Sequence, residues 1–403
     1  MQLALCGVTA LRVLRAARQG LVGQQGVPRK RTSLLAPDPG QGRKRFTAGI
    51  LADLSISQWA IPSDRPLDVA VPDQRQRIQV KGVSCKVFSQ SALQQSFISL
   101  GEGMQVSSPE LLFVEMSQEM PLINLVLLGC ELCGSFGRDP LNPHDGDVVY
   151  WIDPITSTEK LRSFVGSCKN VRGLTRAKEA LRFVMDNAWS PMEALVAVMA
   201  ALPVSHGGYG FSPVILNERV PVSEAASRES RIPDMLFADG KTGLNYDGED
   251  HLDLEKVVVA AQRINNNAAE KASEQQLSST LEVVRSKYVD DRRRDRELIA
   301  SGHLVFSITK EDLAEKGGLD RVMSLVLDAM ERDGGMDLGI QRAAMRVREL
   351  VRMRQDLLWS AMPGALGVRA RQRIARRKAH RRRELEALNA SLRDPNAWET
   401  VMF

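Results

Sequence analysis

The sequence has few cysteines, few aromatic residues and no long apolar run. Five cysteines among 403 residues, an odd number, argue against a scaffold held together by disulfides. No apolar stretch reaches the ~20 residues that a helix needs to cross a bilayer. Since 43% of the residues are hydrophobic and 26% are charged, the composition is that of a globular protein. Collagen-like, low-complexity and wholly disordered chains are therefore excluded.

The opening residues are apolar but are interrupted by arginines. A secretory signal has a basic start followed by an unbroken apolar run, and residues 1–20 do not follow that order. An organellar transit peptide, which is rich in arginine and poor in acids, stays as an alternative. We expect residues 1–26 to be helical, with Leu11, Val13 and Leu14 on the buried side.

A single Cys-x-x-Cys pair, Cys130 and Cys133, lies in the apolar segment LVLLGCELCG. A structural zinc site needs four ligands, usually as two such pairs, and the sequence has no second pair. We therefore expect no zinc, and two reduced thiols on one face of a buried helix. Reduced thiols are typical of a cytoplasmic protein.

Charge is strongly segregated along the chain. The net charge of +5 hides nine Lys/Arg and one acid in residues 1–50, and fourteen Lys/Arg and two acids in residues 342–383. Residues 51–341 are correspondingly acidic. An acidic body with two basic ends indicates a polyanionic partner.

The pattern of elements predicts a multidomain fold of the α+β and α/β classes. We expect a basic N-terminal helix and arm (1–50), then a small sheet plus a helical region (51–220), with short Val/Ile alternations at 66–106 as the strands. A nuclease-like domain (221–335) and a basic helical tail (336–403) follow. The Gly-rich segment 205–213 has neither a dinucleotide-binding nor a P-loop pattern, so a structural turn is favoured there.

Residues 231–251 predict a hairpin that carries acidic groups. PDMLFA and GLNYD have strand composition, and Asp239-Gly240 marks the turn between them. Pairing these strands brings Asp234 and Asp247 to one end of the sheet, where two carboxylates suit Mg²⁺. His251 follows and can transfer protons near neutral pH. The alternative is a polar hairpin with solvated aspartates.

Residues 231–310 also resemble the very-short-patch-repair-like branch of the PD-(D/E)XK nucleases. That branch shows PD, then (V/I)E-x-DG-x-x-H, then D-x-x-R-x-x-x-L-x-x-x-G-x-x-V. This chain supplies Pro233, Asp234, Asn245, Asp247, Gly248, His251, Asp291, Arg294, Leu298, Gly302 and Val305 at those positions. The rest of the chain is similar to uncharacterised actinobacterial proteins that are grouped with AbiEi-like antitoxins of toxin–antitoxin systems.

The resemblance implies an αβββαβ restriction-endonuclease-like core and metal-dependent hydrolysis of DNA. It implies that Asp234 and Asp247 hold Mg²⁺ or Mn²⁺ and that His251 assists proton transfer. The residues that support them would be Asn245, Gly248, Glu249, Asp291 and Arg294.

Two positions depart from the family pattern. Asn245 stands where the family has a metal-binding Glu, and Ser307 stands where it has an Arg. A neutral carboxamide removes one negative charge from the metal shell and weakens Mg²⁺ binding, unless Glu249 or Glu229 substitutes. A catalytically degenerate, antitoxin-like regulator that binds DNA is therefore the alternative function.

The basic tail predicts contact with nucleic acid. Arg-rich helices neutralise phosphates and give salt-dependent affinity. The expected nucleic-acid-binding residues are Arg371, Arg373, Arg376, Arg377, Lys378, Arg381, Arg382 and Arg383. A protein partner, or the acidic body of the chain itself, is the next alternative, which would make the chain an interaction scaffold. An anionic membrane surface is the least favoured, because aromatic anchors other than Trp359 are scarce.

Overall fold

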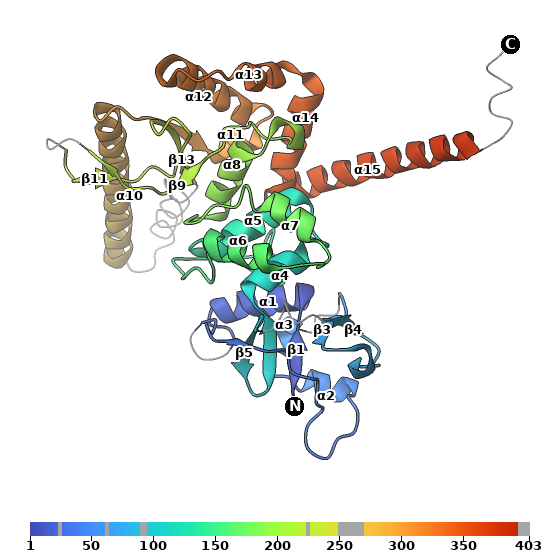
Figure 1. Ribbon diagram of the computed structural model, residues 1–403. Coiled ribbons are helices and arrows are strands. Elements are labelled where there is room, and N and C mark those ends of the chain that lie inside the picture. The colour runs from blue at the N-terminus through green and yellow to red at the C-terminus, as the bar shows by residue number, and fades with distance from the viewer. Residues whose placement is uncertain (23–25, 61–63, 89–94, 223–225, 249–269, 394–403) are drawn as a thin grey trace, which may run out of the picture.

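The computed structural model describes residues 1–393 except 23–25, 61–63, 89–94, 223–225 and 249–269, and its fold is mixed α/β, as the sequence predicts. Figure 1 shows an N-terminal sheet, a helical middle and an upper lobe with a second sheet. One long helix projects from the side of this body. Buried apolar residues from both sheets and from the helices between them form one continuous core.

The N-terminal sheet has six strands in the order β2-β5-β6-β1-β3-β4. Its strands are β1 (Leu3–Leu5), β2 (Arg31–Thr32), β3 (Leu67–Val71), β4 (Val83–Val87), β5 (Phe97–Gly101) and β6 (Met104–Ser107). β1 is central: it runs parallel to β6 and antiparallel to β3. The strands predicted within residues 66–106 are confirmed, and pairing through β1 joins residues 1–50 to that same sheet.

The prediction of one helix over residues 1–26 is wrong at its start. Residues Leu3–Leu5 form β1, and helix α1 spans Gly7–Arg18. Gly7 has a φ of +56°, which glycine adopts readily and which turns the chain from strand to helix. The predicted buried side of the helix is confirmed, because its leucines and valine at positions 11, 13 and 14 are all buried.

The helical middle contains α4 (Pro109–Met116), α5 (Leu122–Cys133), α6 (Thr158–Ser167), α7 (Leu174–Ala180) and α8 (Pro191–Ala201). Ser108 and Ser190 cap α4 and α8 by accepting main-chain N–H groups, each with a proline at the first helical position. Both cysteines of the Cys-x-x-Cys pair are buried free thiols on α5, as predicted. A short hairpin of β7 (Phe136–Arg138) and β8 (Val148–Tyr150) follows α5.

The second sheet has the order β14-β13-β12-β9. Its strands are β9 (Ile215–Leu216), β12 (Met235–Leu236), β13 (Thr242–Asp247) and β14 (Leu304–Thr309). β9, β12 and β13 are antiparallel neighbours, whereas β14 runs parallel to β13 after the crossover that contains α10 (Glu270–Ala300). The predicted hairpin is confirmed, and the Asp239 carboxylate closes its turn by accepting the N–H of Thr242 at 2.9 Å.

The C-terminal part consists of helices α11 (Lys310–Ala314), α12 (Gly318–Gly334), α13 (Gly339–Arg346), α14 (Arg348–Ala361) and α15 (Gly364–Arg393). α14 belongs to the body, because its Arg354 is only 2% exposed, pairs with Asp320 and lies over the ring of Tyr209. The first turns of α15 pack against α14, with contacts that reach as far as Arg377, and the rest of the helix extends outward (Figure 1). None of the described helices combines the length and apolar character needed to span a bilayer.

Candidate functional site

The β12–β13 pair places three of the predicted site residues on one face of the second sheet. Met235 is opposite Leu244, so Asp234 lies opposite Asn245. Asp247 is two residues beyond Asn245 on the same strand, and residues two apart share a face. This arrangement agrees with the predicted convergence of the two aspartates toward one end of the sheet.

Asn245 is bonded to the neighbouring strand. Its side chain is 1% exposed, and its Oδ1 atom accepts the main-chain N–H of Asp234 at 3.1 Å. The Asp234 Oδ2 atom in turn accepts the main-chain N–H of Tyr246 at 2.6 Å. The two side chains therefore tie the ends of β12 and β13 together, in addition to the ladder of the sheet.

Asp247 faces helix α10. Its Oδ1 atom lies 3.9 Å from Nη2 of Arg294, and that same guanidinium lies 3.5 Å from Oδ1 of Asp291. The motif residues Asp291 and Arg294 thus hold α10 against the end of β13.

The remaining residues of the matched spacing have a packing role. Leu298 is fully buried and clusters with Val220 and Leu236, and Val305 packs against that cluster. Gly302 has a φ of +81°, a left-handed conformation that lets the chain turn from α10 into β14. The spacing from Asp291 to Val305 is therefore what one helix–turn–strand crossover requires.

Sequence reasoning missed a buried carboxylate, Glu193 of α8. It is 4% exposed, its Oε1 atom accepts from Nδ2 of Asn217 at 2.5 Å, and its carboxylate also accepts the N–H of Trp189. Burial, and then the negative charge of Asp234, raise the pKa of Glu193 to about 8. The sequence shows Glu193 only as the third residue of a capped helix, and such a glutamate is usually part of the cap.

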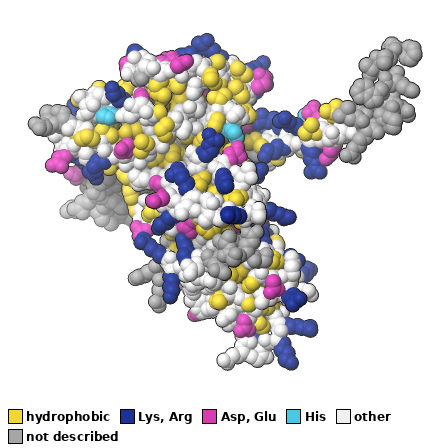
Figure 2. Space-filling model, viewed as in Figure 1, with side chains coloured by type: hydrophobic (Ala, Val, Ile, Leu, Met, Phe, Trp, Pro, Cys, Tyr) yellow, Lys and Arg dark blue, Asp and Glu magenta, His cyan; other side chains and the backbone are white. Residues whose placement is uncertain are grey.

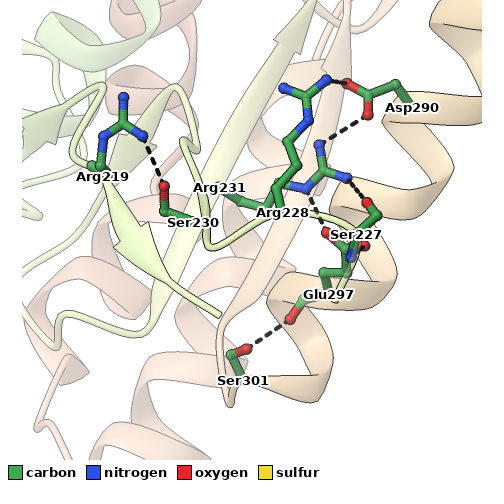
Figure 3. Close-up of polar contacts among 8 residues, drawn as sticks. All are labelled: Arg219, Ser227, Arg228, Ser230, Arg231, Asp290, Glu297 and Ser301. Atoms are coloured by element: carbon green, nitrogen blue, oxygen red, sulfur yellow. Dashed lines mark hydrogen bonds and ion pairs between the residues drawn. The ribbon is translucent and has the colours of Figure 1, made fainter. Parts of the chain in front are cut away.

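A cluster of ion pairs fixes α10 relative to a small hairpin of β10 (Val220–Pro221) and β11 (Ser230–Arg231). Figure 3 shows Arg231 and Arg228 reaching from the hairpin segment toward α10. Arg231 donates to Glu297 at 2.6 Å and to Asp290 at 2.9 Å, while Arg228 donates to Asp290 at 3.1 Å. The hydrogen bond from Arg231 lowers the pKa of Glu297 to about 2.

The described residues fit a divalent cation poorly. The Asn245 oxygen is occupied by a main-chain N–H, and the Arg294 guanidinium stands beside Asp247 where a metal ion would compete with it. Within the described ranges, no group of three His, Cys, Asp or Glu side chains is placed to hold a metal ion. Gly248 follows β13, whereas Glu249 and His251 lie outside the described residues.

The predicted nucleic-acid residues divide into two sets. Arg373 and Arg377 pair with Asp356 of α14, and Arg371 donates to the carbonyl of Ser360. The second set is exposed and does not pair with α14, and it consists of Arg376, Lys378, Arg381, Arg382 and Arg383. Arg382 pairs with Glu386 of the same helix, and the other four form no ion pair with any described residue. Figure 2 shows Lys and Arg side chains gathered on the projecting helix near the body.

No family model, curated protein or solved structure matches the chain. Its function is therefore inferred from geometry and side-chain chemistry. Two features stand out: the carboxylate-bearing end of the β12–β13 pair, and the exposed cations of α15.

Proposed function

We propose that this chain is a DNA-binding protein, and that α15 is the element that holds the phosphate backbone. The observation that carries the proposal is the exposed cation set of α15, Arg376 to Arg383, on a helix that leaves the body. A helix of 30 residues is about 45 Å long, which exceeds one turn of B-form DNA, roughly 34 Å. Contacts of this kind neutralise phosphates and carry no sequence information.

The base of α15 is held so that its cations face outward. Asp356 accepts from both Arg373 and Arg377, and Arg373 lies over the ring of Trp359 at 5.5 Å. The outward set continues for two turns beyond these anchors. Because these contacts already fix the start of α15, binding to DNA costs less conformational entropy.

The second sheet supports the same proposal at the level of architecture. Apart from the separate β10–β11 hairpin, which lies between β9 and β12 in the chain, the elements α8, β9, β12, β13, α10 and β14 occur in the αβββαβ order that the sequence resemblance implies. A core of this kind acts on DNA in the family that residues 231–310 resemble. Because Asn245 replaces the metal-binding Glu and is bonded to Asp234, we assign the chain a regulatory, antitoxin-like role without hydrolysis.

Metal-dependent hydrolysis of DNA is the second candidate function. The observation that favours it is Glu193, a buried carboxylate close enough to Asp234 for their charges to interact. It would add a carboxyl group next to Asp234, at the end of the β12–β13 pair. Mg²⁺ or Mn²⁺ would be the cofactor in that case.

The DNA-binding proposal is tested by fluorescence anisotropy on a labelled duplex longer than α15, titrated with salt. The test variant replaces Arg376, Lys378, Arg381 and Arg383 by alanine. The matched control replaces four exposed cations that lie outside α15 and outside both basic ends of the chain, namely Arg75, Lys81, Arg172 and Lys178. We expect the slope of log affinity against log salt to fall by about 3–4 in the test variant, since each phosphate contact contributes ~0.9. Equal slopes in all three proteins would refute the proposal.

Hydrolysis is tested on supercoiled plasmid with Mg²⁺ or Mn²⁺. The regulatory role predicts binding without nicking. Nicking that both Asp234→Ala and Asp247→Ala abolish would replace it by the second candidate. If the protein neither nicks nor binds DNA, the remaining alternative is that the chain is a protein-interaction scaffold.

A further inference from the structure

A pocket of about 770 Å³ lies in the N-terminal half of the chain, away from the second sheet and α15. It forms where residues 26–31 pass the loop after β8 and the start of α6. Four cations line it, Arg18, Arg29, Arg31 and Lys160, and apolar side chains that include Trp151 and Ile98 complete the wall. Pockets of this size that combine apolar surface with a few convergent polar groups are typical ligand sites.

Two of the four cations are already bound within the protein. Arg31 donates to Oε2 of Glu110 at 2.6 Å, and the other oxygen of that carboxylate accepts from Thr156 at 2.6 Å. Arg18, only 8% exposed, donates to main-chain carbonyls of Asp153, Glu131, Phe136 and Gly134. The side chain of Glu131 is taken by Arg15, so Arg18 brings a buried positive charge whose hydrogen bonds go to neutral carbonyls.

The other two cations add to a surplus of positive charge. Arg29 and Lys160 are exposed and form no ion pair with another described residue. Among the described residues that line the pocket, Asp153 is the one acidic residue, against four cations. Lys160 also sits in the first turn of α6, where the helix dipole disfavours a cation. A site that gathers positive charge against this preference attracts an anion.

Trp151 gives the pocket a flat apolar surface. Its side chain is 79% exposed, and its φ of +61° is a left-handed conformation that a bulky residue rarely adopts. The ring is 5.7 Å from that of Trp189, at an interplanar angle of 55°. Strained backbone and an exposed aromatic ring at a pocket are features of ligand-binding sites, and an exposed Trp is a platform on which a base stacks.

We propose that this pocket binds a nucleotide, with the phosphate on Arg29, Lys160 and the edge of Arg18 and the base on Trp151. The combination of an aromatic platform with surplus cations fits a planar base joined to an anion better than it fits phosphate alone. The same chemistry is offered by a free nucleotide and by the 5′-phosphorylated end of a single strand. The proposal goes beyond DNA binding by α15 and uses none of its residues.

Isothermal titration calorimetry on the full chain tests the proposal with five probes: AMP, adenosine, inorganic phosphate, a short oligothymidylate with a 5′-phosphate, and the same oligothymidylate without it. We expect AMP to bind at least tenfold more tightly than adenosine or inorganic phosphate. Tighter binding of the 5′-phosphorylated oligothymidylate than of AMP would identify a strand end as the ligand, and the reverse would identify a free nucleotide.

Variants locate the site. Lys160→Ala and Trp151→Ala should each weaken AMP binding about tenfold or more, and Trp151→Phe should restore part of the loss, because a ring still stacks. Lys169→Ala, an exposed lysine outside the pocket, is the matched control and should leave AMP binding unchanged. The α15 quadruple variant should also bind AMP normally, which separates this proposal from the first. If no nucleotide probe binds, or if Lys160→Ala and Trp151→Ala bind like the wild type, the proposal is overturned.

Discussion

Asn245 and Asp234 are joined across neighbouring strands: Oδ1 of Asn245 accepts the main-chain N–H of Asp234 at 3.1 Å. In the nuclease family that this segment resembles, a metal-binding Glu takes the position of Asn245. Here the same position connects β12 to β13. Compared with the family pattern, this position supplies a hydrogen bond inside the sheet and no negative charge. Removing the hydrogen bond and restoring the charge are two separate tests of this difference.

The first prediction concerns stability. Asn245→Ala leaves the main-chain N–H of Asp234 without its acceptor, and an unsatisfied buried donor costs about 1–3 kcal/mol. We expect the free energy of unfolding in urea to fall by that amount. Asn389→Ala, at an exposed position of α15, is the control and should change stability by less than about 0.5 kcal/mol. Equal stability of the two variants would contradict the structural role of Asn245.

The second prediction restores the missing carboxylate. Asn245→Glu places a negative charge next to Asp234, so without metal the variant should melt at a lower temperature than the wild type. Millimolar Mg²⁺ should raise its melting temperature and leave that of the wild type nearly unchanged, because a ligand that binds only the folded state stabilises it. A wild-type protein that responds to Mg²⁺ as strongly as the variant would show that Asn245 does not weaken the site.

The third prediction is a pH dependence. The pKa of Glu193 is about 8 in the folded protein, above its ordinary value of 4.5, so folding favours the protonated form. The stability that it contributes is full below pH 4.5 and is lost as the pH rises through 8. Glu193→Gln should remove this part of the decline, on the order of a few kcal/mol between those limits. Glu349→Gln, at an exposed position, should keep the wild-type profile.

The fourth prediction concerns a buried ion pair between α1 and α5. Arg15 donates to both oxygens of Glu131, at 2.8 and 2.6 Å, and both side chains are almost fully buried. Glu131→Ala leaves a buried guanidinium without its partner and should cost about 3–5 kcal/mol. The double variant Arg15→Met/Glu131→Leu should lose less, since it removes the Arg15 guanidinium together with its partner. A double variant that is less stable than Glu131→Ala would refute this account.

The fifth prediction concerns the ion pairs that hold the start of α15 against α14. Asp356→Asn weakens the pairing with Arg373 and Arg377, so trypsin should cut at these arginines faster than in the wild type. Glu386→Gln breaks the ion pair with Arg382 within α15 and leaves the contacts with Asp356 intact. Its cleavage pattern near Arg373 should therefore stay as in the wild type. Mass spectrometry of the limited digests identifies the sites. Identical rates in all three proteins would mean that Asp356 does not hold the helix.

Local signals in the sequence predicted those elements that depend on a few neighbouring residues. The turn at Asp239 and the strand composition on either side of it predicted the β12–β13 hairpin, and short Val/Ile alternations predicted the strands within residues 66–106. β1 was missed, because a three-residue strand becomes a strand only by pairing with β3 and β6, far along the chain.

The same limit applies to the candidate sites. The pairing of one hairpin predicted that Asp234 and Asp247 come to one end of the sheet. Glu193 comes from an earlier helix, and its proximity to Asp234 is a tertiary fact that spacing does not encode. The nucleotide pocket draws on separate segments of the chain, and Trp151 is conspicuous only through its exposure and backbone conformation.

The central place of β1 affects how this protein folds during translation. The ribosome makes residues Leu3–Leu5 early, yet their parallel partner β6 begins only at Met104. At ~5–20 residues per second, the apolar strand waits several seconds for its neighbours. During that interval the nascent chain exposes an unpaired hydrophobic edge, the kind of surface that chaperones bind. Newly made chains should therefore depend on chaperones more than the finished fold does.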